Sequence, residues 1–116
     1  MELSFESRDL RAVCEFESEA QKELGARVAA VLKRRLADMR AATSIKDLVA
    51  GRPRELEGAD GEFMVIDLSD GFWLVFAANH PRNSRTTSGE LDWAKISRIK
   101  ILKIETKNDR SSRFPT

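Results

Sequence analysis

Residues 20–39, AQKELGARVAAVLKRRLADM, carry the strongest periodic signal in the chain. Apolar side chains recur there at intervals of three and four residues, which places them on one face of an α-helix. These side chains are Ala20, Leu24, Val28, Val31, Leu32, Leu36 and Met39. Ser18 and Gln21 form a capping-box pattern, so we expect one long helix that begins near Ser18 and is weakened by Gly25. The opposite face is basic (Arg27, Lys33, Arg34, Arg40) and is either solvated or faces phosphate.

Upstream of this helix, the pattern predicts a short strand and a first helix. Leu3 and Phe5 alternate with polar residues, as in a half-buried strand. Ser7 is a good N-cap for a helix over residues 8–15. Cys14 on that helix is interpreted as a small buried hydrophobic residue.

Downstream, the pattern changes from helical to strand-like. Residues 62–68 and 72–78 predict two strands, joined by Asp70-Gly71, a strong hairpin signal. A last strand is expected over residues 96–104, where the adjacent apolar residues Ile101 and Leu102 indicate a bulge or burial on both faces. The loop of about eleven residues between these strands is long for a hairpin connection, and long loops often carry function.

The chain is therefore expected to form a single α+β domain over residues 1–116, with a flexible tail at residues 108–116. Its 116 residues, 41% of them hydrophobic, suffice for one core. No segment is apolar enough to span a membrane, and the N-terminus is unlike a signal peptide, so we expect a cytoplasmic protein. With one cysteine (Cys14) and one histidine (His80), we expect no disulfide, metal or cofactor.

The net charge is only +1, but the charges are segregated along the chain. Residues 1–23 and 55–76 carry net charges of −4 and −6, whereas residues 24–54 and 77–116 carry +6 and +5. Such blocks can place a basic and an acidic surface on one small protein, so the low net charge does not exclude a polyanionic partner. The alternative is an ordinary solvated surface.

Four segments, taken in order, resemble the RelE/ParE superfamily of bacterial toxins, and in particular its HigB-like branch. They are ELSFESRDLRAVCE (residues 2–15), LKRRLADMRAATSIKDL (32–48), LVFAANHP (74–81) and GELDWAKISRIKILKIE (89–105). The resemblance covers residues 1–108 and rests on the shared order of these segments. It implies a RelE-like fold, with an N-terminal strand and a helical hairpin packed on an antiparallel sheet.

The resemblance also implies a function. A HigB/RelE-like toxin of a type II toxin–antitoxin system binds a helix-turn-helix antitoxin and acts on ribosome-bound mRNA as a metal-independent endoribonuclease. Such a reaction needs cations at the phosphate and groups that transfer protons. The residues expected to bind RNA are Arg82, Arg85, Arg98, Lys100 and Lys103, whose alternative role is charge at a sheet edge that discourages aggregation.

The chain departs from the family at two places. Trp73 stands where the branch has an arginine, and Thr106, Lys107 and Asn108 replace an acidic, phenolic and imidazole trio. The candidate catalytic residues are therefore Lys107, Asn108 and the loop histidine His80, although a loop histidine more often caps the backbone.

These departures leave two other functions open besides RNA cleavage. One is a catalytically degenerate RelE-like protein that binds an antitoxin without cutting RNA. The other is a ParE-like gyrase poison. Trp73 and Trp93 could stack on RNA bases, but core packing is the stronger expectation for both.

Overall fold

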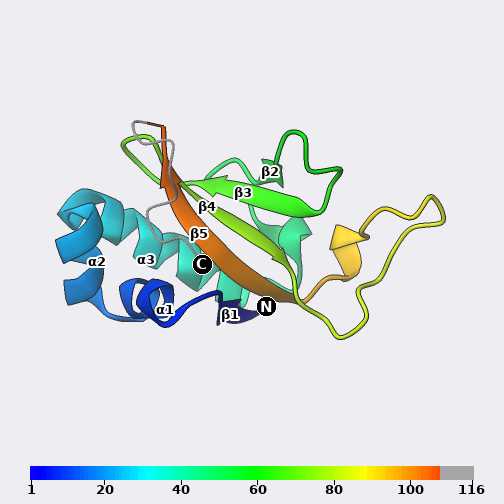
Figure 1. Ribbon diagram of the computed structural model, residues 1–116, viewed down its shortest axis with the longest axis horizontal. Helices are drawn as coiled ribbons and strands as arrows, with labels where there is room; N and C mark the ends of the chain where they lie inside the picture. Colours follow the sequence, from blue (N-terminus) through cyan, green and yellow to red (C-terminus); the bar gives the residue numbers. More distant parts are fainter. Residues whose placement is uncertain (108–116) are drawn as a thin grey trace.

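The computed structural model describes residues 1–107, so the predicted tail and Asn108 lie outside the described residues. Within that range, three helices pack on a five-stranded sheet of order β1-β5-β4-β3-β2 (Figure 1). The strands are β1 (Glu2–Phe5), β2 (Arg54–Glu55), β3 (Phe63–Asp67), β4 (Phe72–Ala78) and β5 (Arg98–Thr106). The helices are α1 (Arg8–Glu15), α2 (Glu17–Leu24) and α3 (Ala26–Ala41), with short 3₁₀ turns η1 (Ile45–Asp47) and η2 (Trp93–Lys95). None of the described helices combines the length and the apolar character that crossing a membrane requires.

The first helix begins where the sequence predicts. The Ser7 hydroxyl oxygen accepts a hydrogen bond from the Leu10 backbone N–H at 3.2 Å and so satisfies one free donor of the first turn. The helix covers residues 8–15, as predicted.

The prediction of one long helix from Ser18 to Met39 is wrong. The segment forms two helices, α2 and α3, that meet at Gly25, where φ is +88°. Ser18 lies inside α2, which begins after Phe16 without a side-chain cap. The seven apolar side chains of the predicted stripe are all buried, because the break leaves each of them facing the same core.

The hairpin turn and the bulge occur at the residues predicted from the sequence. Asp70 and Gly71 both have positive φ, at 55° and 79°, as a type I′ turn between β3 and β4 requires. In the β4–β5 pairing, Phe76 lies opposite Ile101 and Val75 opposite Lys103, so Leu102 is the extra residue of a bulge. The strand itself is displaced by two residues from the predicted range, to 98–106.

The sheet is mixed, which corrects the expectation of an antiparallel sheet. Strand β1 pairs with β5 in parallel, whereas the β5–β4, β4–β3 and β3–β2 pairs are antiparallel. Because β1 and β5 lie about ninety residues apart in the chain, no local pattern specifies their relative direction.

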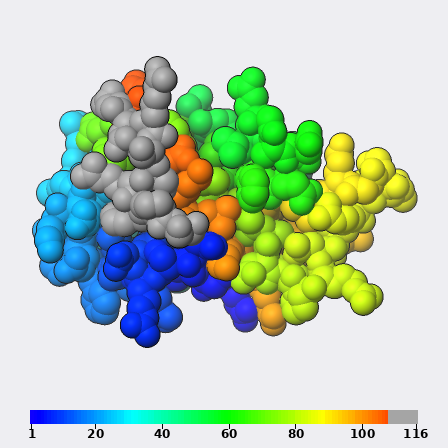
Figure 2. Space-filling model, in the orientation of Figure 1, coloured from blue at the N-terminus to red at the C-terminus, as the bar shows by residue number. Residues whose placement is uncertain are grey.

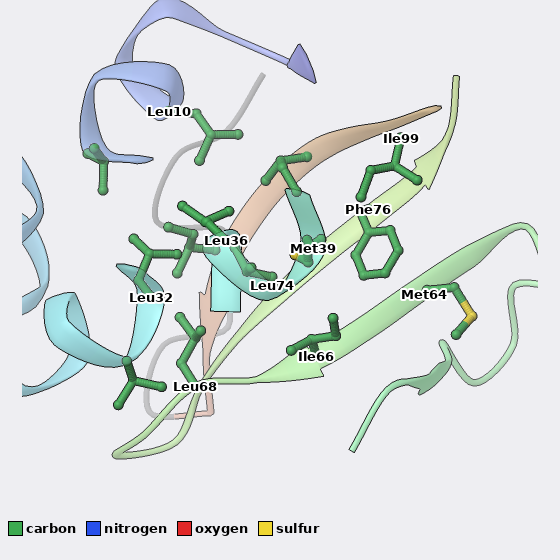
Figure 3. Close-up of a cluster of buried hydrophobic side chains, with 14 of the residues drawn as sticks. Leu10, Leu32, Leu36, Met39, Met64, Ile66, Leu68, Leu74, Phe76 and Ile99 are labelled. Atoms are coloured by element: carbon green, nitrogen blue, oxygen red, sulfur yellow. The ribbon is translucent and has the colours of Figure 1, made fainter. Parts of the chain in front are cut away.

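The hydrophobic core lies between the helices and one face of the sheet (Figure 3). Leu32, Leu36 and Met39 of α3 pack there against strand side chains that include Leu74, Phe76, Ile99 and Ile101. Cys14 packs at the margin of this core, and burial raises the pKa of its thiol to about 12. The alternate strand positions, which include Val65, Trp73 and Val75, point to the other side; we call that side the helix-free face.

Candidate nucleic-acid interface

The bulge in β5 determines which basic residues share a face. Residues 100 and 103 are separated by three positions, which in a regular strand places their side chains on opposite faces. The extra residue Leu102 shifts the alternation of side chains by one position. Lys103 therefore lies opposite Val75, on the same face as Lys100, while Ile101 and Ile104 both stay in the core. Arg98, Lys100 and Lys103 therefore all lie on the helix-free face.

Each of these three cations has a carboxylate partner. Arg98 Nε lies 3.0 Å from Glu2, Lys100 Nζ lies 3.2 Å from Glu6, and Lys103 Nζ lies 2.7 Å from Glu105. The cationic side chains remain between 38% and 50% exposed. Partly exposed ion pairs of this kind contribute at most about 1 kcal/mol. A phosphate can therefore compete for the cations, although the face is close to electrically neutral without one.

The two loop arginines belong to a different segment from this row. Residues 79–92 extend beyond the end of β5 at which Arg98 lies, and Figure 2 shows the loop projecting from the body of the molecule. The Arg85 guanidinium donates to both oxygens of Glu62, at 3.1 and 3.2 Å, and to the Gly89 carbonyl at 3.0 Å. This hydrogen-bonded pair holds the pKa of Glu62 below its usual value. Arg85 thus anchors the loop, whereas Arg82 is exposed on it.

His80 holds the start of β5. Its Nε2 accepts hydrogen bonds from the backbone N–H groups of Ser97 at 3.0 Å and Arg98 at 3.2 Å. The Nε2 lone pair is thereby engaged with the protein's own backbone, which is the capping role that loop histidines commonly have.

Lys107 lies at the opposite end of β5. Its backbone N–H donates to the Gly71 carbonyl at 3.0 Å, and its aliphatic stem lies over the β3–β4 turn. The nine-residue strand β5 begins beside His80 and ends before Lys107, and at about 3.3 Å per residue it is up to about 30 Å long. These two candidate catalytic residues therefore cannot act on the same phosphate.

The two tryptophans lie on different faces. Trp93 is buried, its ring meets Phe76 edge to face at 6.1 Å, and its Nε1 donates to the Gly61 carbonyl at 2.8 Å, which confirms core packing. Trp73 is not in that core; it lies on the helix-free face and lines a pocket of about 380 Å³. The other lining residues are Arg54, Glu55, Leu56, Glu57, Val65 and Glu105.

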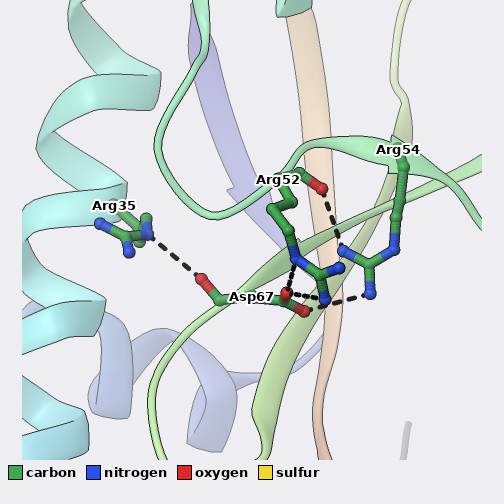
Figure 4. Close-up of polar contacts among 4 residues, drawn as sticks. All are labelled: Arg35, Arg52, Arg54 and Asp67. Carbon is green, nitrogen blue, oxygen red and sulfur yellow. Dashed lines mark hydrogen bonds and ion pairs between the residues drawn. The ribbon is translucent and has the colours of Figure 1, made fainter.

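A cluster around Asp67 positions one wall of this pocket (Figure 4). Arg52 Nε and Arg54 donate to the Asp67 carboxylate at 2.8 and 3.1 Å, and Arg35 Nε donates to the Asp67 carbonyl at 3.1 Å. Burial raises the pKa of Asp67, but the hydrogen bonds from the two arginines outweigh that effect and the pKa is lowered. The cluster ties residues 51–55 to β3.

Sequence reasoning missed both the pocket and the Asp67 cluster. If residues 72–78 alternate strictly, the side chain of Trp73 lies on the other face of the strand from those of Leu74 and Phe76, outside the helix-side core. No local pattern pairs Asp67 with Arg52 and Arg54, because that contact depends on how β2 returns to β3.

Among residues 1–107, no group of three or more histidine, cysteine, aspartate or glutamate side chains converges in a way that could hold a metal ion. No protein-family model, curated protein or solved structure matches this chain. The resemblance to RelE/ParE toxins therefore stays a prediction from the sequence segments.

Proposed function

We propose that this chain is the toxin of a bacterial type II toxin–antitoxin system of the HigB/RelE-like kind. In this proposal it acts in the cytoplasm on ribosome-bound mRNA as an endoribonuclease and is neutralised by a helix-turn-helix antitoxin. The observation that supports the proposal best is the row of Arg98, Lys100 and Lys103 on the helix-free face, which depends on the bulge at Leu102.

The row suits an RNA backbone for two physical reasons. Cations on a strand can follow successive phosphates of a single strand, and their present carboxylate partners are exposed enough to be displaced. Cations fixed at a phosphate also stabilise the charge that develops when a ribose 2′-hydroxyl attacks it.

A second function, a RelE-like protein that binds its antitoxin without cutting RNA, is favoured by a separate observation. His80 uses Nε2 to hold two backbone N–H groups, and Lys107 lies beyond the other end of β5, a strand up to about 30 Å long. The Nε2 atom of His80 is therefore already engaged, and the two described candidates for proton transfer do not lie together.

Tightly induced expression of the chain alone, combined with primer extension on abundant messages, separates the two functions. Growth arrest with new 5′ ends inside coding regions supports cleavage. Unimpaired growth with intact messages, from soluble and folded protein, contradicts cleavage and supports the binding protein. The variant Lys100→Gln with Lys103→Gln removes two cations of the row and tests whether this surface binds the RNA. Cleavage that persists unchanged in this variant would contradict the assigned surface.

A further inference from the structure

The C-terminal end of β5 places a carboxylate between two cations on the helix-free face. Lys103, Glu105 and Lys107 occupy alternate positions of the chain, and the intervening residues Ile104 and Thr106 are buried. Because alternate side chains of a strand share a face, the three charged side chains lie on the face opposite to the core, at intervals of about 7 Å. Their order along the strand is cation, carboxylate, cation.

Among the carboxylates paired with the row, Glu105 is the least exposed. Its Oε1 lies 2.7 Å from Lys103 Nζ, and its side chain is 25% exposed. Glu2 is 74% exposed and is therefore held loosely. Glu6 is 28% exposed, but it follows the end of β1 and is paired with Lys100 in the middle of the row. Glu105 is the one of the three that stands on the same strand as the cations on both sides of it.

Lys107 supplies the second cation beside Glu105. Its backbone N–H donates to the Gly71 carbonyl at 3.0 Å, which continues the pairing of β4 with β5 by one residue. Its side chain is exposed and forms no ion pair with another residue of the range 1–107. A proton acceptor and an unpaired proton donor therefore lie two residues apart at one end of the cation row.

This arrangement contains the groups that cleavage of RNA by its own 2′-hydroxyl requires. A carboxylate can accept the proton of the hydroxyl, and an ammonium can protonate the oxygen that leaves. A further ammonium at the phosphate stabilises the negative charge that develops there. His80 and Lys107 do not supply such a set, because they lie at opposite ends of β5.

We propose that Glu105 is the catalytic proton acceptor of RNA cleavage, with Lys107 as the proton donor and Lys103 at the phosphate. The proposal rests on the cleavage function proposed above and assigns its proton transfers. Glu105 takes the proton of the 2′-hydroxyl, the 2′ oxygen forms a bond to phosphorus, and the bond from phosphorus to the 5′ oxygen of the next nucleotide breaks. That 5′ oxygen takes a proton from Lys107. The products carry a 2′,3′-cyclic phosphate and a 5′-hydroxyl, and water returns the proton from Glu105 to Lys107.

Single-turnover cleavage of a synthetic message on ribosomes tests Glu105, once primer extension has located the cut. Glu105→Gln keeps the size of the side chain and is expected to slow cleavage by on the order of 100-fold, also at saturating protein. The matched control is Glu2→Gln, which removes a carboxylate paired with another cation of the same row and should leave the rate within about twofold. An unchanged indole resonance of buried Trp93 in each variant reports an intact core.

A message with sulfur in place of the 5′ oxygen at the cut separates the two proton transfers. A thiolate leaves without needing a proton, so this message should restore most of the rate lost in Lys107→Ala and little of the rate lost in Glu105→Gln. Equal restoration in both variants would overturn the assigned roles.

Three further results would overturn the proposal. Cleavage by Glu105→Gln at the wild-type rate would remove Glu105 from the reaction and leave the cleavage function standing. Equal slowing in Glu2→Gln, or slowing that disappears at saturating protein, would reduce Glu105 to a group that affects binding. A folded wild-type chain that leaves the message intact would contradict the cleavage function and this proposal together.

Discussion

The two faces of the sheet are built from alternate residues of the same strands, yet they differ in almost every physical respect. On the helix side, Leu74, Phe76 and Ile101 are fully buried in an apolar core. On the helix-free side, Trp73 and Lys103 are partly exposed among charged neighbours. The helix-free side is not uniform, however, because Val65 and Val75 on it are also buried. The comparison indicates that its partly exposed positions are the ones available for binding.

Phe76→Ala should give the largest loss of stability. It removes a fully buried ring and its edge-to-face contact with Trp93, so we expect a loss of about 3–5 kcal/mol in the free energy of unfolding. Lys100→Ala on the other face should cost less than about 1 kcal/mol. Urea unfolding of both variants measures the difference, and similar losses would contradict the division between the two faces.

Gly51→Ala should come next. Its φ is +86°, and an added Cβ would lie 2.6 Å from Ile66 Cγ2 and 2.8 Å from the Asp67 carbonyl oxygen. Strain and overpacking together should cost about 2 kcal/mol or more. Gly58 has a similar φ of +81° but open space around it, so Gly58→Ala should cost only about 1 kcal/mol. Equal thermal shifts in the two variants would show that backbone conformation, and not packing against β3, decides the effect.

Asp67→Asn should have a smaller and pH-dependent effect. The pKa of the folded-state carboxyl is lowered, so its stabilising contribution is present above its unfolded-state pKa of about 3.9 and is lost as the pH falls through the folded-state value. Because the group is partly exposed, we expect a loss of about 1 kcal/mol at pH 7. Unfolding curves of the wild type and the variant should converge at low pH. A difference that is constant with pH would exclude the ionic contribution.

Local features of this fold could be predicted from sequence, and long-range ones could not. The Ser7 cap, the Asp70-Gly71 turn and the bulge at Leu102 each depend on residues within a few positions of one another. Periodicity also identified the buried stripe, although it missed the helix break because the apolar residues on both sides of Gly25 face the same core.

The candidate site shows the same limit. Alternation and the bulge place the cations of β5, but their partners Glu2 and Glu6 come from the other end of the chain, through the parallel pairing of β1 with β5. The separation of His80 from Lys107 also became clear only from the strand that lies between them. Charge segregation along a sequence thus predicts the presence of basic residues and not whether they are already paired.

The most direct test of the account replaces the β5 row, Arg98→Gln with Lys100→Gln and Lys103→Gln, and measures binding of a fluorescent single-stranded oligoribonucleotide as a function of salt. Lys22→Gln with Arg34→Gln and Lys46→Gln, on the helical side, is the matched control. We predict little loss of stability, weaker binding, and a slope of log affinity against log salt that falls in magnitude by about 2, because each lost contact with a single strand contributes about 0.7. An unchanged affinity and slope in the row variant, or an equal loss in the control, would contradict the claim that the helix-free face binds RNA.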